Sequence, residues 1–237
     1  MFIYMLEIRG VEKVYDVAGQ KRKVLSNIRI NFRTSEFVAI LGPSGSGKTT
    51  LLKIINDLLT PTSGKVLVNG KEVGIESKKI ISYLPERTYL DKGMKVNEVI
   101  KFFSDFYEDF DSEKAHKLLK DLDLDTNQKL SKMSKGMQEK VQLVLVMSRK
   151  AQLYILDEPL GGVDPATRDY ILDTILTNFN EGASVIISTH LISDIERILD
   201  EVIFIDKGKI ILHEETDALR NKENDSIDNI FRRMFKC

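Results

Sequence analysis

Short apolar runs alternate along the chain with segments whose apolar residues recur every three or four positions. The runs 37–41, 80–84, 153–156 and 184–188 are rich in aliphatic residues and are bounded by polar or turn-forming ones, which is typical of strands buried in a sheet. Helical spacing follows the first of these runs and the third. Strands that alternate with helices predict an α/β fold with a mainly parallel sheet.

A second group of runs predicts antiparallel pairing. Segments 5–9 and 24–32 have the composition of antiparallel strands, and segment 64–70 predicts a short strand between turns. Segments 202–206 and 209–213 predict a hairpin-like pair. We therefore expect an antiparallel β part beside the parallel sheet.

The middle of the chain has a different rhythm. Apolar and aromatic residues repeat at helical spacing over 96–110, a second helix follows to 122 with Ser112 as its expected N-cap, and a third spans 137–149. The aromatic residues of the first helix are expected to form ordinary core. Together these helices predict a helical insertion over residues 86–150.

A phosphate-binding pattern, G-x-x-x-x-G-K-[ST], lies directly after the run 37–41 and directly before a helix. Its residues are Gly42, Pro43, Ser44, Gly45, Ser46, Gly47, Lys48 and Thr49, followed by Thr50. The glycines let successive backbone N–H groups surround an anion, and the helix N-terminus adds its positive dipole end. Lys48 can reach the β- and γ-phosphates, and Thr49 can offer its hydroxyl to Mg²⁺. The pattern predicts a nucleoside triphosphate as the ligand.

Polar residues follow two of the predicted buried strands at their carboxyl ends, where open α/β sheets bind ligands. Asp157 and Glu158 follow one strand, and His190 follows the next. Phosphoryl transfer needs a divalent cation and a group that orients the attacking water. We expect Asp157 to hold Mg²⁺ through its water shell, Glu158 to polarise the water, and His190 to contact the γ-phosphate or that water.

Composition sets limits on the class of protein. Of 237 residues, 35 are Lys or Arg and 36 are Asp or Glu, interspersed along the chain, so a large nucleic-acid footprint is not expected. The single cysteine, Cys237, excludes an intrachain disulfide and favours a reducing compartment. The longest purely apolar run, 1–6, is far shorter than a spanning helix and has no basic leader. We expect a soluble, cytoplasmic chain.

These motifs, in this order and spacing, resemble the nucleotide-binding subunit of an ATP-binding cassette (ABC) transporter over about residues 5–213. The segments that carry the resemblance are 42–49, 153–158, Gly161-Gly162-Val163-Asp164 and Ser188-Thr189-His190. The resemblance implies that Tyr15 stacks on adenine, that Asp164 belongs to the loop that crosses between two cassettes, and that His190 is the switch histidine. It also implies a P-loop NTPase fold in one domain over 1–237, whose core comprises 1–85 and 151–213 and whose helical tail is 214–237.

Two motifs depart from the commonest form of the family. The signature segment, usually Leu-Ser-Gly-Gly-Gln, is here Met133-Ser134-Lys135-Gly136-Met137, which keeps Ser134 and Gly136 and adds the cation of Lys135. Glu86 occupies the place of the usual Q-loop glutamine, and its carboxylate remains an acceptable oxygen ligand for Mg²⁺. Both variants resemble those of bacitracin-resistance and related peptide-efflux ATPases.

The resemblance implies a mechanism with two cassettes. Each ATP would lie between the phosphate loop of one chain and the signature segment of the other, so the partner is a second copy or a homologous ATPase chain. An integral membrane permease would receive the motion through a groove around 86–103, which places the chain peripherally on the inner face of the cell membrane. A soluble cassette ATPase of DNA repair or translation, and a nucleotide sensor without turnover, are the alternatives.

The tail contains one apolar helical face, formed by Ile227, Ile230, Phe231, Met234 and Phe235. Ser226 is the expected N-cap, and basic residues cluster at the C-terminal end. Such a face packs against its own domain, or it contacts a membrane subunit or an anionic lipid surface. The sequence leaves these alternatives open.

Overall fold

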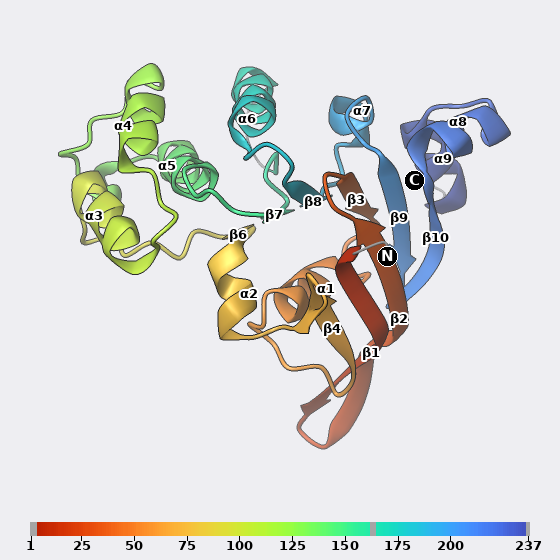
Figure 1. The fold of residues 1–237 in the computed structure, drawn as a ribbon. Helices are drawn as coiled ribbons and strands as arrows, with labels where there is room; N and C mark the ends of the chain where they lie inside the picture. Colours follow the sequence, from red (N-terminus) through yellow and green to blue (C-terminus); the bar gives the residue numbers. More distant parts are fainter. Residues whose placement is uncertain (1–3, 162–164, 236–237) are drawn as a thin grey trace.

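A six-stranded, mainly parallel sheet forms the centre of the computed structural model, which describes residues 4–161 and 165–235 (Figure 1). Its order is β10-β9-β3-β8-β7-β6, in which only β10 runs antiparallel to its neighbour. The strands are β3 (Phe37–Leu41), β6 (Ile81–Leu84), β7 (Leu153–Asp157), β8 (Ser184–Ser188), β9 (Glu201–Asp206) and β10 (Lys209–Glu215). Every residue of β3, β7 and β8 is buried, as in a parallel sheet covered on both faces.

A four-stranded antiparallel sheet covers one face. Its order is β2-β1-β4-β5, and its strands are β1 (Tyr4–Val17), β2 (Gln20–Arg33), β4 (Ser63–Val68) and β5 (Lys71–Glu72). Helix α1 (Lys48–Ile55) lies between the two sheets, where its apolar residues join one hydrophobic cluster with both (Figure 1). The predicted P-loop core with an antiparallel β part is therefore confirmed.

The first two strands extend well beyond the predicted limits. They continue into a two-residue turn at Ala18 and Gly19, both of which have positive φ. The regular alternation of apolar and polar residues is broken by register shifts on either side of Val11. Because these bulges re-aim the side chains, sequence periodicity did not reveal the outer half of the hairpin.

The helical insertion forms a separate cluster of helices at one side of the sheet (Figure 1). Its elements are α3 (Val96–Phe106), α4 (Ser112–Asp121), the short 3-10 helix η1 (Leu130–Lys132) and α5 (Lys135–Met147). The N-cap prediction for α4 was wrong by one residue, because Asp111 accepts the Lys114 N–H at 2.9 Å. Helix α3 also ends four residues earlier than predicted, although Phe110 still packs against Phe103.

The opposite face of the large sheet is covered by helices α5, α6 (Pro165–Asn178), α7 (Ile192–Ile195), α8 (Thr216–Glu223) and α9 (Ile227–Phe235). A short helix, α2 (Ile75–Ile80), precedes β6 and was not predicted, since its sequence is polar and barely one turn and a half long. The two layers hold the carboxyl ends of β3, β7 and β8 at one edge of the sheet.

The tail folds back onto the domain. Ile227, Ile230 and Phe231 of α9 are buried in the main cluster, and the Phe231 ring meets Phe204 of β9 at a centroid distance of 5.6 Å. Ser226 caps the helix as expected, because its hydroxyl accepts the Asn229 N–H at 3.2 Å. Self-packing therefore accounts for most of the apolar face. No described helix is long and apolar enough to cross a membrane.

Candidate nucleotide site

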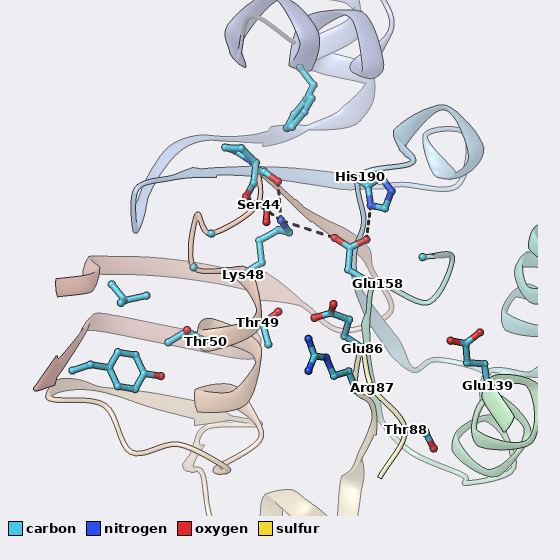
Figure 2. Close-up of a pocket in the computed structure, with 18 of the residues that line it drawn as sticks. Ser44, Lys48, Thr49, Thr50, Glu86, Arg87, Thr88, Glu139, Glu158 and His190 are labelled. Carbon is cyan, nitrogen blue, oxygen red and sulfur yellow. Dashed lines mark hydrogen bonds and ion pairs between the residues drawn. The ribbon is translucent and has the colours of Figure 1, made fainter. Parts of the chain in front are cut away.

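A cavity of about 1630 Å³ opens at the carboxyl edge of the large sheet (Figure 2). The phosphate loop forms its floor, the β1–β2 hairpin supplies one wall, and α5 supplies another. Glu158 and His190 close its inner end, and Glu86 with Arg87 lines the side after β6. The cavity thus collects many of the predicted residues from elements far apart in the sequence, whereas Ser46 and Asp157 lie beside it without lining it.

The phosphate loop is braced by contacts that only glycine permits. Gly45 and Gly47 have positive φ values of 78° and 113°, which turn the loop around its concave side. A Cβ on Gly42 would collide with the Ile205 carbonyl oxygen. The Gly208 N–H donates to the Ser46 carbonyl at 2.9 Å, so the β9–β10 turn supports the loop from outside. The Ser46 hydroxyl is buried without a partner among the described residues, and Ser46 is not one of the residues that line the cavity.

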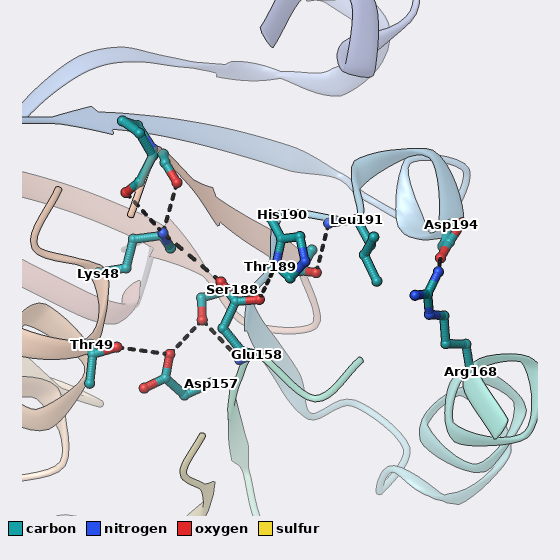
Figure 3. Close-up of polar contacts among 12 residues, drawn as sticks. Lys48, Thr49, Asp157, Glu158, Arg168, Ser188, Thr189, His190, Leu191 and Asp194 are labelled. Atoms are coloured by element: carbon teal, nitrogen blue, oxygen red, sulfur yellow. Dashed lines mark hydrogen bonds and ion pairs between the residues drawn. The ribbon is translucent and has the colours of Figure 1, made fainter. Parts of the chain in front are cut away.

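Lys48 is held inside the loop at the start of α1. Its ammonium donates to the Gly42 carbonyl at 2.7 Å and to that of Pro43 at 3.3 Å, and it lies 4.0 Å from the Glu158 carboxylate (Figure 3). Burial lowers the pKa of this ammonium, while the Glu158 and Asp157 carboxylates act in the opposite direction. A buried cation with carbonyl partners and one distant carboxylate is well placed to accept phosphate oxygens.

Asp157, the last residue of β7, lies beside Thr49. One carboxylate oxygen, Oδ1, accepts the Ser188 hydroxyl at 2.6 Å and the Thr49 hydroxyl at 3.3 Å (Figure 3). The other, Oδ2, is buried and has no hydrogen-bond partner among the described residues. Burial raises the pKa of Asp157, and the hydrogen bonds from Ser188 and Thr49 oppose this rise. Such a carboxylate gains most from a nearby cation.

The residues present fit a magnesium ion. An orphaned carboxylate oxygen of Asp157, the Thr49 hydroxyl and the nearby Glu86 are hard oxygen donors of the kind Mg²⁺ prefers. The described residues contain no cluster of three or more His, Cys, Asp or Glu side chains with metal-binding geometry.

Glu158 and His190 form a close pair. The His190 Nδ1 atom lies 2.8 Å from Glu158 Oε2, and the other carboxylate oxygen faces Lys48 (Figure 3). Glu158 has a φ of 52°, an unfavourable value for a residue with a side chain, and its N–H donates to the Ser188 carbonyl at 3.0 Å. Backbone strain of this kind is characteristic of active sites, and here it directs the carboxylate into the cavity.

Ser188 is a site residue that the sequence did not single out for a role. It pairs with Asp157 across the parallel strands β8 and β7, and its hydroxyl links Asp157 to the Glu158 N–H. The signal was present in its position, since residues at the ends of adjacent parallel strands lie side by side. Ser188 therefore fixes the geometry of both acidic residues.

Tyr15 lines the far wall of the cavity from β1, where Lys13 approaches its ring at 5.2 Å. The signature segment lies at the N-terminus of α5, the helix whose Glu139 lines another side of the cavity (Figure 2). Ser134 caps that helix, because its hydroxyl accepts the Met137 N–H at 3.2 Å. Lys135 lines the cavity, whereas Ser134 and Gly136 are not among the described residues that do. Asp164 and the two residues before it lie outside the described part of the chain.

Comparison with known proteins fixes the family, because residues 25–161 match the ABC transporter family. This chain belongs to that family. It is similar to the lantibiotic transport ATP-binding protein SrtF of Streptococcus pyogenes, with 30% identity over 92% of this chain and 94% of that protein. It is also similar to the SkfA peptide export ATP-binding protein SkfE of Bacillus subtilis, with 28% identity over 87% of each.

Solved structures agree with this assignment. The dimeric bacterial ABC transporter cassette MJ0796 matches with a TM-score of 0.79 and 25% identity, over 90% of this chain and 99% of that one. The predicted family and the predicted cassette fold are both confirmed. The chain is accordingly an ATP-binding ABC ATPase.

Proposed function

We propose that this chain is the ATP-hydrolysing subunit of a membrane exporter and that it works as part of a pair of cassettes. The observation that carries the proposal is the arrangement around Lys48, where Asp157, Glu158 and His190 meet at one edge of the sheet. Phosphoryl transfer depends on positioning and on charge stabilisation, and these four side chains supply both.

Each of these side chains has its own part in hydrolysis. Lys48 binds the β- and γ-phosphate oxygens, and Glu158 accepts a hydrogen bond from the attacking water and orients it in line with the γ-phosphate. His190 holds the Glu158 carboxylate through its contact at 2.8 Å and lies where it can reach the γ-phosphate. Thr49, Asp157 and Glu86 would hold Mg²⁺, which neutralises charge that develops on the phosphates.

The signature segment acts on a second cassette. Ser134, Lys135 and Gly136 would meet the γ-phosphate held by the partner chain, and Asp164 would lie in the loop between the two chains. Support comes from the N-terminus of α5, where Lys135 lines the cavity, and from the dimeric state of MJ0796. ATP drives closure only as far as it binds the closed pair more tightly than the open one.

The membrane partner is proposed to bind the helical insertion. Phe102 and Phe106 of α3 are 55% and 69% exposed and stack on each other at 5.9 Å, and Tyr89 is also exposed. An exposed apolar patch of this kind indicates a protein contact. Export is proposed because SrtF and SkfE are named for lantibiotic transport and peptide export. The chain would then lie at the inner face of the cell membrane.

Co-purification tests this proposal. The tagged chain, extracted from its native membranes in mild detergent, should bring down an integral membrane protein and hydrolyse MgATP. Replacing Phe102 and Phe106 with Ser should release that protein and leave the ATPase activity of the isolated chain unchanged. Ile211→Ser, which alters an exposed apolar residue on β10, is the matched control.

The soluble alternative makes a different prediction. A cassette ATPase that is not coupled to transport would hydrolyse MgATP, remain in the soluble fraction and bring down no membrane protein. A nucleotide sensor would bind MgATP without turnover. Either result would reject the exporter role and leave the family assignment intact.

A further inference from the structure

Tyr83 is a half-buried polar residue near Asp157, and it has no part in the proposed hydrolysis of ATP. It is the third residue of β6, and it pairs with Ile155 on the adjacent parallel strand β7. Asp157 lies two residues beyond Ile155 on the same strand. Side chains two residues apart on a strand point to the same face, so Tyr83 and Asp157 share one face of the sheet.

Each of these two residues has an oxygen atom that is buried and has no hydrogen-bond partner among the described residues. These atoms are the Tyr83 hydroxyl oxygen and Asp157 Oδ2. Asp157 Oδ1 already accepts two hydroxyl groups, from Ser188 and Thr49, so Oδ2 is the free acceptor. Leaving a buried polar atom unpaired costs about 1–3 kcal/mol, and folded proteins contain few such atoms. The Tyr83 hydroxyl lies close enough to Asp157 for the carboxylate charge to raise its pKa.

The chemistry of Tyr83 suits a donor in this position. Burial raises the pKa of its hydroxyl, and the negative charges of Asp157 and Glu86 raise it further. The phenol therefore keeps its proton throughout the physiological pH range. A neutral hydroxyl next to an ionised carboxylate is stabilised by donating a hydrogen bond to it.

We propose that Tyr83 is a positioning residue for the divalent cation of the nucleotide site. Its hydroxyl donates to Asp157 Oδ2 in the loaded site and fixes the plane of that carboxylate. With Ser188 and Thr49 on one oxygen and Tyr83 on the other, Asp157 cannot rotate away from the metal's water shell. The inference rests on the proposed ATP site, and it assigns Tyr83 a role in metal affinity and none in binding the nucleotide itself.

The test measures metal binding directly. In a Glu158→Gln background, which preserves bound ATP, Mn²⁺ affinity of the protein–ATP complex is titrated by electron paramagnetic resonance. Partners of metal ligands typically change metal affinity by 10–100-fold, so Tyr83→Phe should weaken Mn²⁺ binding by about tenfold. ATP affinity measured in EDTA should stay unchanged.

Tyr154→Phe is the matched control. Tyr154 is fully buried on β7, and its hydroxyl donates to the Arg149 carbonyl, away from the nucleotide. This variant loses a buried hydroxyl just as Tyr83→Phe does. It should lower the melting temperature and leave Mn²⁺ affinity unchanged, so a general loss of packing can be told from a loss of metal positioning.

A double-mutant cycle decides whether Tyr83 acts through Asp157. Asp157→Asn should weaken Mn²⁺ binding alone, and adding Tyr83→Phe should then cause little further loss. Fully additive losses, or a Tyr83→Phe variant that binds Mn²⁺ as tightly as its parent, would overturn the proposal. If the Glu158→Gln parent binds no ATP with or without Mn²⁺, the proposed ATP site itself fails, which is a distinguishable result.

Discussion

The two ends of the nucleotide cavity differ in how far one chain completes them. At the phosphate-loop end, Lys48 and Asp157 are 8% and 1% exposed, and each is held by contacts from other elements. At the signature end, the Lys135 side chain is 80% exposed and forms an ion pair at 3.4 Å with Glu139, one turn along the same helix. Ser134 is exposed, and its hydroxyl accepts a hydrogen bond from Met137 of its own helix.

This difference shows which end of the cavity is already ordered by contacts within one chain and which end is not. The phosphate-loop end is organised by contacts within the chain, as expected of a site that binds ATP first. At the signature end, the N-terminus of α5 is capped by the Ser134 hydroxyl alone, and no acidic residue lies in its first turn. ATP can therefore bind to the phosphate-loop end before two cassettes close. Closure then depends on whether the signature end meets the ATP held by the partner cassette.

The largest expected effect comes from Glu158→Gln at the phosphate-loop end. The amide keeps the size of the carboxylate but no longer attracts the proton of the attacking water, so MgATP turnover should fall by about 10²–10⁴-fold. ATP should still bind, and MgATP-dependent dimers should persist in size-exclusion chromatography. Wild-type phosphate release by the variant would exclude Glu158 from catalysis.

Glu201→Gln is the control for that substitution. Glu201 contacts His213 at 2.6 Å, which repeats the Glu–His pairing on β9 and β10 away from the cavity. Turnover should be unchanged in this variant. A comparable loss in both variants would mean that breaking such a pair harms the fold in general.

At the signature end, Ser134→Asp should separate nucleotide binding from dimer formation. Aspartate is as good an N-cap as serine, so α5 should keep its stability. Its negative charge would repel the partner's γ-phosphate and remove a donor worth about 1.5–3 kcal/mol, so dimers should weaken by about 10–100-fold. The measurement is ATP-dependent dimerisation in the Glu158→Gln background, with ATP affinity of the monomer as a second readout.

Asp111→Ala provides the reverse case. It removes the cap of α4, should cost about 0.5–2 kcal/mol of stability, and should leave dimerisation unchanged because α4 has no motif residue. If Ser134→Asp dimerises as readily as its parent, the signature segment does not contact the nucleotide of the partner cassette, and the signature end is not completed by dimerisation.

The sequence predicted the phosphate-loop end better than the rest of the molecule. The motif from Gly42 to Thr49 and the acidic pair after β7 are local, because strand, loop and helix follow one another directly. Ser188 was missed as a partner of Asp157, since its role arises only when β7 and β8 lie side by side. The orphaned oxygen of Asp157 is likewise a property of packing that no spacing of residues reveals.

Helix limits were predicted less well, because apolar spacing reports burial rather than backbone conformation. Phe110 continued the helical pattern although α3 ends at Phe106, since it packs on Phe103 from the loop that follows. The tail was ambiguous for a related reason. Its apolar face had to be covered, but only the fold shows that Phe204 of β9 is the surface that meets Phe231.

A smaller effect is expected from Asp157→Asn on stability without metal. Burial raises the pKa of Asp157 above its value in the unfolded chain. At any pH where Asp157 is ionised in the unfolded chain, this carboxyl group therefore lowers the stability of the folded state. At pH 7.5 the variant should therefore gain about 1 kcal/mol, or roughly 2–4 °C in melting temperature. The gain should vanish below about pH 4, where both states hold the proton.

Thermal melts in EDTA across that pH range check this expectation. Added Mg²⁺ with ATP should reverse the order, because it stabilises the parent and not the variant. A variant that is less stable than its parent at pH 7.5 in EDTA would show that the hydrogen bonds from Ser188 and Thr49 outweigh the cost of the buried charge.

The smallest expected effect tests how independent the two ends are. Gln142 of α5 is buried, and its Nε2 donates to the Pro85 carbonyl at 3.3 Å, directly before Glu86, while its Oε1 has no partner in the described part of the chain. It thus connects the signature helix to the metal side of the cavity. Gln142→Leu should change stability by less than about 1 kcal/mol, because the lost hydrogen bond is offset by removing an unpaired oxygen.

Dimerisation is where Gln142→Leu should differ from its parent. If the contact with Pro85 transmits the presence of MgATP to α5, the ATP concentration that gives half-maximal dimer in the Glu158→Gln background should rise about two- to fivefold, as the loss of one neutral hydrogen bond predicts. Ser82→Ala is the matched control, because it removes the other side-chain hydrogen bond between β6 and α5, from Ser82 to the Val146 carbonyl at 2.9 Å, farther from Glu86. Equal shifts in both variants would indicate that α5 is only anchored to the sheet, whereas a shift confined to Gln142→Leu would identify Pro85 as the connection between the completed end of the cavity and the incomplete one.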